Sequence, residues 1–216
     1  MALRILVVDD HAVVRRGVRA LLESHEGWEV CGEATTGRDA VEQSRQLRPD
    51  IVVMDLILPG LNGLDATRQI LKDSPDTEVL LLTMHHSEEL ARDVLQAGAR
   101  GYVLKSDADE NLLTAVDHLR QHKPFLTSVV TEFMLDEYLG RRAGQQDDVA
   151  PAAVTARERE IIQLIAEGHS SKEAASTLGL SVKTIEAHRA NIMRKLHLRS
   201  VSDLVRYAIR NRIVQP

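Results

Sequence analysis

Residues 51–65 read IVVMDLILPGLNGLD, an apolar run that leads into an acidic residue and then a turn. Ile51–Met54 has no polar alternation, which is typical of a strand buried on both faces of a parallel sheet. Asp55 follows at once, and Pro59-Gly60 is a turn signal. A carboxylate therefore lies at the carboxyl end of a predicted strand, where open α/β sheets bind their ligands.

The same pattern recurs through the first 123 residues. Apolar runs of strand length alternate with segments of helical periodicity, such as the stripe formed by Val14, Val18 and Leu22. Five such β–α units predict an α/β fold, a doubly wound five-stranded parallel sheet with helices on both faces. The other four strands are predicted at Ile5–Val8, Val30–Ala34, Val79–Leu82 and Tyr102–Leu104.

Polar residues follow three of these strands as well: Asp9-Asp10, Thr83 and Lys105. Because parallel strands end at one edge of the sheet, we expect these side chains to converge with Asp55. Three neighbouring carboxylates repel one another unless a hard cation holds them, and oxygen ligands suit Mg²⁺. A carboxylate beside Mg²⁺ can act as a nucleophile toward a phosphoryl group, with lysine balancing the charge. For a single aspartate, helix capping would be the simpler explanation.

The charge of the chain is unevenly distributed. Residues 1–150 hold 16 Lys+Arg and 26 Asp+Glu, net −10, whereas residues 151–216 hold 11 and 6, net +5. A basic end on an acidic body indicates a polyanionic partner for that end. Solvated charge without any partner is the alternative.

The basic segment shows the pattern of a helix-turn-helix. Thr155 and Glu158 have the spacing of a capping box. Leu178-Gly179-Leu180-Ser181 forms a tight glycine-containing turn, after which Ser181 caps a third helix that would enter the DNA major groove. A plain helical bundle with a basic face is the alternative. We expect Val182, Ile185, Ile192 and Leu196 to face inward, and Lys183, Thr184, Glu186, Ala187, Arg189, Ala190, Arg194 and Lys195 outward.

Several classes of protein are disfavoured by the sequence. No apolar run approaches the roughly 20 residues of a membrane helix, and the N-terminus lacks a signal-peptide core. Cys31 is the single cysteine, so we expect no disulfide framework and a cytoplasmic location without membrane association.

The segments VVDDH, VVMDLILPGLNGLD, LLLTM and GARGYVLKS resemble the four signature segments of the receiver domain of two-component response regulators. The resemblance implies a 2-1-3-4-5 strand order and phosphorylation of Asp55 by a sensor histidine kinase. Met84 departs from the family pattern, in which this position is usually small. The implied roles are Mg²⁺ binding by Asp9, Asp10, Asp55 and the backbone carbonyl of Ile57, phosphoryl pairing by Lys105, and switching by Thr83 and Tyr102.

TARERE and AEGHSSKEAASTLGLSVKTIEAHRANIMRKLHLRS resemble the LuxR-type DNA-binding domain, so the whole chain resembles the NarL/FixJ family of response regulators. The resemblance implies that the last helix, Val201–Arg210, pairs two copies on double-stranded DNA, giving a homodimer upon phosphorylation. It implies DNA-backbone contacts by Lys183, Thr184, His188 and Lys195, and base contacts by Glu186, Ala187, Ala190 and either Arg189 or Asn191. Some members carry lysine in place of Glu186 and Ala190, so their operator does not transfer to this chain.

We therefore predict a receiver domain at 1–123, a helical and flexible linker at 124–153 and a LuxR-type helix-turn-helix domain at 154–216. The predicted function is a DNA-binding transcriptional response regulator without substrate turnover of its own. A Mg²⁺-dependent phosphotransferase or phosphatase would need an acid two residues after Asp55 and a capping insertion, and the sequence has Ile57 and no insertion. A helical adaptor that binds protein through its C-terminal bundle is the third possibility.

Overall fold

The computed structural model describes residues 2–84, 88–126, 154–211 and 213–214. The chain forms two compact units, an N-terminal α/β unit and a C-terminal helical unit, and each is described by itself. The helical and flexible linker predicted over 124–153 is outside the described residues except for Pro124, Phe125 and Leu126. No helix in the described part is long and apolar enough to span a membrane.

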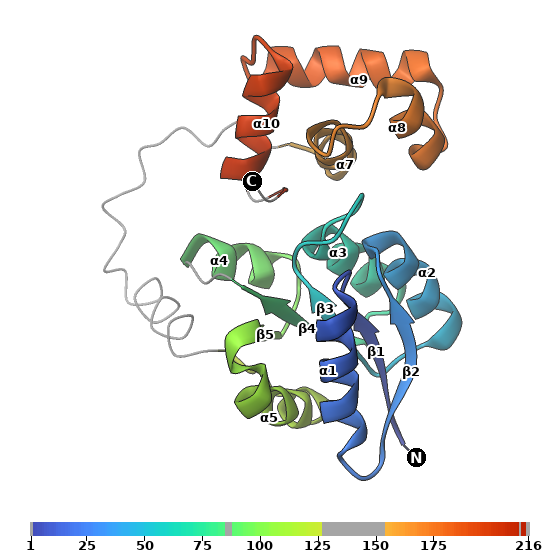
Figure 1. Ribbon diagram of the computed structural model, residues 1–216, viewed down its shortest axis with the longest axis vertical. Helices are drawn as coiled ribbons and strands as arrows, with labels where there is room; N and C mark the ends of the chain where they lie inside the picture. The colour runs from blue at the N-terminus through green and yellow to red at the C-terminus, as the bar shows by residue number, and fades with distance from the viewer. Residues whose placement is uncertain (1, 85–87, 127–153, 212, 215–216) are drawn as a thin grey trace. The chain divides into compact units, whose positions relative to one another are not determined.

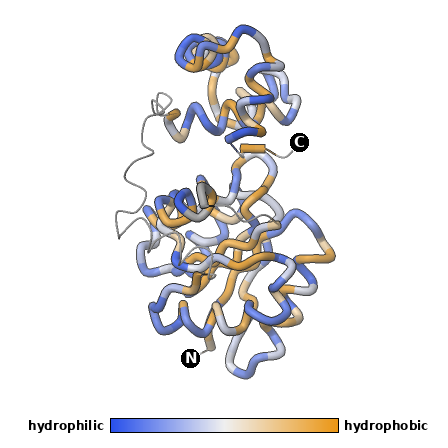
Figure 2. The backbone as a smooth tube through the Cα atoms, turned by 90° about the vertical axis from the view of Figure 1, so that its left-hand side faces the viewer, coloured by the Kyte–Doolittle hydropathy of each residue, from blue (hydrophilic) through white to orange (hydrophobic). Residues whose placement is uncertain are grey.

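The N-terminal unit is built on five parallel strands in the order β2-β1-β3-β4-β5 (Figure 1). This confirms both the predicted fold class and the strand order. Figure 2 shows the strands as apolar stretches in the interior of this unit, and every residue of β3 and β4 is buried. The strands are β1 (Leu3–Val8), β2 (Trp28–Ala34), β3 (Ile51–Asp55), β4 (Glu78–Thr83) and β5 (Gly101–Leu104).

Helices cover both faces of this sheet, α1 and α5 on one face and α2, α3 and α4 on the other (Figure 1). On the α1–α5 face, Leu22 and Leu119 pack against Ile5, Val53 and the other inward strand residues in one apolar cluster. The helices are α1 (Ala12–Glu23), α2 (Gly37–Leu47), α3 (Gly63–Asp73), α4 (Glu88–Gln96) and α5 (Ala108–Arg120), with a short 3-10 turn η1 (Lys105–Asp107) after β5.

The described part of the C-terminal unit consists of four helices around an aliphatic core. Side chains cap two of them as the sequence predicted: Thr155 and Glu158 form a complete capping box, and Ser181 accepts from the backbone N–H of Thr184. Gly179 ends the second helix at φ 63°, a left-handed conformation that glycine adopts without strain. The helices are α7 (Ala156–Ala166), α8 (Ser171–Leu178), α9 (Val182–Lys195) and α10 (Val201–Arg210).

One inward assignment in α9 was wrong. Val182 is 40% exposed, whereas Ile185 and Ile192 are fully buried and Leu196 packs partly against the core. Val182 is the first residue of α9, directly after the Ser181 cap. The apolar stripe that reaches the core therefore begins one turn later, at Ile185.

Candidate functional site

The carboxyl edge of the sheet brings together the acidic residues and the lysine singled out in the sequence. Asp9 follows β1, Asp55 ends β3 and Lys105 follows β5. The Lys105 Nζ lies 2.7 Å from Asp9 Oδ2 and 2.8 Å from Asp55 Oδ2. All three side chains are at most 9% exposed, so the ammonium bridges two carboxylates in a largely dry environment.

Burial and charge act against each other at this site. Burial raises the pKa of Asp55, and the hydrogen bond from Lys105 opposes that rise. Burial alone would lower the pKa of Lys105, but its hydrogen bonds to Asp55 and Asp9 outweigh burial and raise it. Lys105 is therefore cationic at neutral pH and provides a fixed positive charge beside Asp55.

The same edge offers oxygen ligands for a cation. One ligand atom from each of Asp9, Asp10, His11 and Asp55 lies within 4.8 Å of the others. The cluster contains three carboxylates and Lys105 pairs with two of them, so it retains negative charge that a divalent cation would balance. The donor set fits Mg²⁺, which takes carboxylate oxygens and keeps several waters. The backbone N–H of Ile57 lies 3.4 Å from Asp55 Oδ1, so the backbone at Ile57 passes close to the acceptor carboxylate.

The two residues predicted as a switch pair lie on neighbouring strands. Thr83 ends β4 and is 2% exposed, and Tyr102 in β5 is completely buried. The backbone N–H of Tyr102 donates to the carbonyl of Phe125 at 2.9 Å, which ties β5 to the segment following α5. Met84, the departure from the receiver pattern, is 65% exposed, so its bulk projects largely into solvent.

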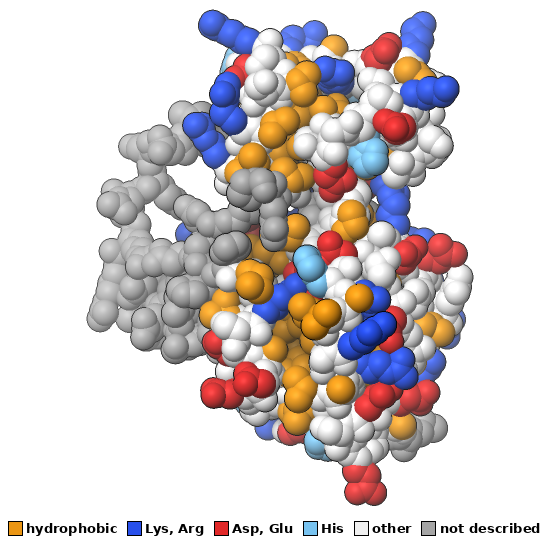
Figure 3. Space-filling view, viewed as in Figure 1, with side chains coloured by type: hydrophobic (Ala, Val, Ile, Leu, Met, Phe, Trp, Pro, Cys, Tyr) orange, Lys and Arg blue, Asp and Glu red, His pale blue; other side chains and the backbone are white. Residues whose placement is uncertain are grey.

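The predicted DNA-contacting residues are distributed along α9. Figure 3 shows Lys and Arg side chains projecting from the part of the C-terminal unit that contains this helix. Thr184, His188, Arg189 and Lys195 are half-buried. The exposed members of the predicted set are Lys183, Glu186, Ala187, Ala190, Asn191 and Arg194.

Some of these residues form hydrogen bonds or ion pairs within the unit. Lys195 Nζ lies 2.7 Å from Glu158 Oε2, which joins the end of α9 to the start of α7. Arg194 donates to Asn191 Oδ1 at 2.5 Å. Lys195 therefore has a structural role in this geometry, besides any contact with DNA.

Comparisons with known proteins cover both units. Residues 5–117 match the model of the response regulator receiver domain, and residues 152–208 match that of bacterial regulatory proteins of the luxR family. The chain is 38% identical over 219 residues to the oxygen regulatory protein NreC of Staphylococcus epidermidis, across 99% of this chain and 100% of NreC. The chain belongs to the NarL/FixJ family of response regulators.

Solved structures of this response regulator family agree. Salmonella typhimurium RcsB is 27% identical with a TM-score of 0.58, covering 95% of this chain and 97% of that chain. An RcsB–DNA complex is 27% identical with a TM-score of 0.59, covering 96% and 98%. This response regulator is thus a phosphorylation-regulated transcription regulator with a DNA-binding domain, and not an enzyme in the usual sense.

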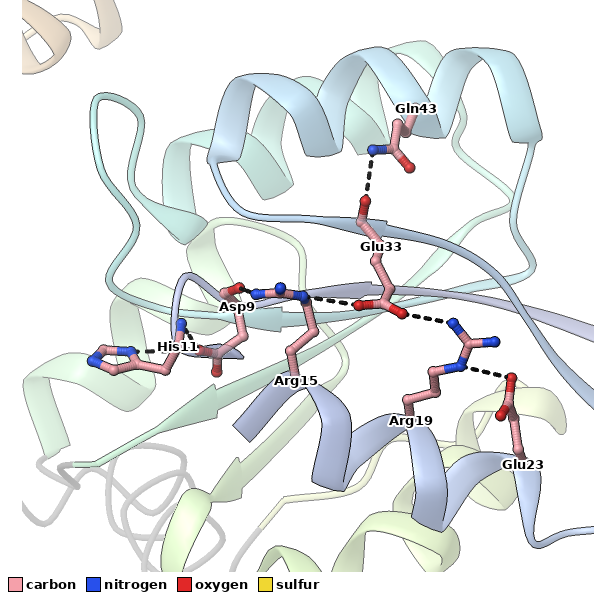
Figure 4. Close-up of polar contacts among 7 residues, drawn as sticks. All are labelled: Asp9, His11, Arg15, Arg19, Glu23, Glu33 and Gln43. Atoms are coloured by element: carbon pink, nitrogen blue, oxygen red, sulfur yellow. Dashed lines mark hydrogen bonds and ion pairs between the residues drawn. The ribbon is translucent and has the colours of Figure 1, made fainter. Parts of the chain in front are cut away.

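Sequence reasoning missed one part of this response regulator's acidic site. Arg15 of α1 donates through Nη1 to the backbone carbonyl of Asp9 at 2.7 Å and through Nε to Glu33 Oε2 at 2.9 Å (Figure 4). Glu33 belongs to β2, far from Asp9 in the sequence. In the sequence Arg15 appears as one of several cations on the polar side of a helix, so no local signal distinguishes it.

Proposed function

We propose that Asp55 is the residue on which this response regulator is phosphorylated, with a sensor histidine kinase as donor. The observation that carries the proposal is the buried Lys105 ammonium placed 2.8 Å from Asp55 Oδ2 and 2.7 Å from Asp9 Oδ2. Asp55 is the central carboxylate of this group, at the end of the middle strand of the sheet. Among the residues of the cluster, Asp55 alone lies at the end of the middle strand, contacts Lys105 directly and has the other possible metal ligands beside it.

The reaction is a direct phosphoryl transfer. A carboxylate oxygen of Asp55 forms a bond to phosphorus while the donor's phosphorus–nitrogen bond breaks, and the histidine nitrogen leaves with the electron pair and takes up a proton. Lys105 stabilises negative charge on the phosphoryl oxygens, because it is held cationic and needs little reorganisation. Thr83 then donates to the new phosphoryl group, and buried Tyr102 repacks behind it.

Asp9, Asp10, Asp55 and the backbone carbonyl of Ile57 would hold Mg²⁺ at this edge. The ion, when bound, balances negative charge on the transferring oxygens. The part of Asp9 and Asp10 in this proposal is to bind and orient the ion. Their proximity to Asp55 supports the assignment.

Replacing the acceptor tests the proposal. Asp55→Asn keeps the shape of the side chain but removes the nucleophilic carboxylate, so we expect no phosphorylated species from acetyl phosphate and Mg²⁺. Intact-mass spectrometry measures the added phosphoryl group. Asp39→Asn, an exposed aspartate in the first turn of α2, is the matched control and should be phosphorylated normally. Equal phosphorylation of Asp55→Asn and wild type would refute the assignment.

We further propose that phosphorylation promotes a homodimer that reads double-stranded DNA through α9. An RcsB relative of the same architecture forms a complex with DNA, which supports this geometry for the family. Lys183, Thr184, His188 and Lys195 would contact the backbone, and Glu186, Ala187, Ala190 and either Arg189 or Asn191 the base edges. Arg194 would contact the DNA as well. Genome-wide footprinting with and without beryllofluoride identifies the operator. Identical occupancy in both states would contradict the coupling.

A further inference from the structure

The peptide between Asp9 and Asp10 joins two of the proposed magnesium ligands. A peptide unit is planar, so the orientation of the Asp9 carbonyl fixes the direction in which the chain continues to Asp10. Nη1 of Arg15 donates to this carbonyl at 2.7 Å. Arg15 thus reaches the acidic site through the backbone that connects the two carboxylates.

Arg15 is itself held in place by Glu33. The Arg15 Nε lies 2.9 Å from Glu33 Oε2, and the two side chains are 16% and 30% exposed. A guanidinium is a planar group whose donors have a fixed relative geometry. Because one donor is bound to Glu33 and another to Asp9, the position of β2 determines where the Asp9 carbonyl is held (Figure 4).

Glu33 is fixed from two neighbouring helices. Arg19 of α1 donates through Nη1 to the second carboxylate oxygen, Glu33 Oε1, at 2.7 Å. Gln43 of α2 donates to the backbone carbonyl of Glu33 at 2.7 Å. The hydrogen bond from Arg19 is the main reason that the pKa of Glu33 lies below its usual range, so Glu33 remains an anion at neutral pH.

The remaining contacts of Asp9 complete a rigid frame. The backbone N–H of Asp9 donates to the carbonyl of Ala34 at 3.2 Å, and Oδ1 accepts from the backbone N–H of His11 at 2.8 Å. His11 Nδ1 in turn lies 2.7 Å from Asp10 Oδ1. The side chains of Asp9 and Asp10 are therefore tied locally, and Arg15 fixes the peptide between them.

We infer that Arg15 is a positioning residue for the metal site, clamped by Glu33 so that the Asp9–Asp10 peptide presents both carboxylates to Mg²⁺. The inference rests on the proposed function, because it concerns the same site. Outer residues that orient metal ligands typically change metal affinity by about 10-fold to 100-fold when they are replaced. Arg15 acts through a backbone carbonyl, so we expect the lower end of that range.

An argument from charge alone predicts that removing Arg15 strengthens Mg²⁺ binding, which is the opposite of the effect expected from a positioning role. Arg15 is a cation close to an acidic site, and removing a nearby positive charge should strengthen the binding of a divalent cation. If Arg15 positions the metal ligands, its removal weakens Mg²⁺ binding. Arg16 provides a matched control, because it is the next residue of α1, carries the same charge and is exposed.

The experiment measures Mg²⁺ affinity by isothermal titration calorimetry of the full chain after chelator treatment. We expect Arg15→Met and Arg15→Lys to weaken binding by about 10-fold, since one lysine ammonium cannot replace the guanidinium fork. Arg16→Met should bind Mg²⁺ nearly as wild type does. Fluorescence of Trp28, the only tryptophan, reports whether each variant's N-terminal unit is folded.

Each outcome decides the inference. Unchanged or tighter binding by either Arg15 variant overturns it, and so does an equal loss in Arg16→Met. Arg15→Lys keeps the charge and the aliphatic stem, so its Mg²⁺ affinity decides the test if Arg15→Met does not fold. Absence of Mg²⁺ binding by the wild-type chain would instead refute the proposed metal site, which distinguishes the two failures.

Discussion

At the residue scale, the acceptor depends on a glycine eight positions further along the chain. The backbone N–H of Gly63 donates to the carbonyl of Leu56 at 2.8 Å, which brings the start of α3 against the end of β3. A Cβ at Gly63 would lie 2.2 Å from the backbone oxygen of Asp55 and 3.0 Å from Leu56 Cα. Both neighbours are backbone atoms, so rotation of a side chain cannot relieve the overlap.

We expect Gly63→Ala to destabilise the N-terminal unit by about 1–3 kcal/mol, the usual cost of overpacking. Asp55 must also move with its backbone, so phosphorylation should slow. Urea unfolding followed by Trp28 fluorescence measures the stability. Gly17→Ala is the control: it lies exposed in α1, where an added methyl group would have no neighbour within 4 Å, and should stabilise by about 0.5–1 kcal/mol. Equal stability of Gly63→Ala and wild type would contradict the packing argument.

The sequence predicted residues whose position follows from the backbone alone. Asp9, Asp55 and Lys105 converge because each follows a buried strand and parallel strands end at one edge. The role of Arg15 could not be predicted, because it depends on the direction of a long side chain toward β2. The ion pair between Lys195 and Glu158 could not be predicted either, because α7 and α9 meet only in the folded unit.

At the scale of elements, an ion pair joins the end of α9 to the start of α7 in the C-terminal unit. Glu158 takes part in the capping box of α7 and also accepts from Lys195. The hydrogen bond from Lys195, followed by that from the backbone N–H of Thr155, lowers the pKa of Glu158 in the folded state. Its stabilising effect is therefore present above the ordinary carboxylate pKa and is lost as the pH falls through the lowered folded value.

We expect Glu158→Gln to reduce the stability of this unit by about 1 kcal/mol near pH 7, and the difference from wild type to shrink as the pH falls below about 4. Hydrogen exchange of α7 and α9 peptides, corrected for intrinsic rates, measures the effect. Glu173→Gln alters the analogous capping box of α8, where Ser170 holds the carboxylate, and should cost less. A Glu158→Gln difference independent of pH would show that the ion pair contributes nothing.

At the scale of the whole molecule, the part of the chain that contains the acidic site is negatively charged and the part that contains the DNA-binding domain is positively charged. The net charge is −10 over residues 1–150 and +5 over residues 151–216. Positive charge in direct contact with phosphates releases counterions, and each contact steepens the salt dependence of binding by about 0.9 on a log–log scale. Charges further away than about 8 Å are screened at physiological ionic strength, so the acidic unit should have little influence on that slope.

Two lysine substitutions with the same change in net charge therefore have different effects on DNA binding. Lys183→Gln, in the exposed first turn of α9, should lower the magnitude of the salt slope by about 1 and weaken binding to operator and random DNA alike. Lys72→Gln, exposed at the end of α3, should leave the slope unchanged. Fluorescence anisotropy of the full chain across a salt series measures both. Equal slopes for the two variants would mean that overall charge, and not contact through α9, attracts the protein to DNA.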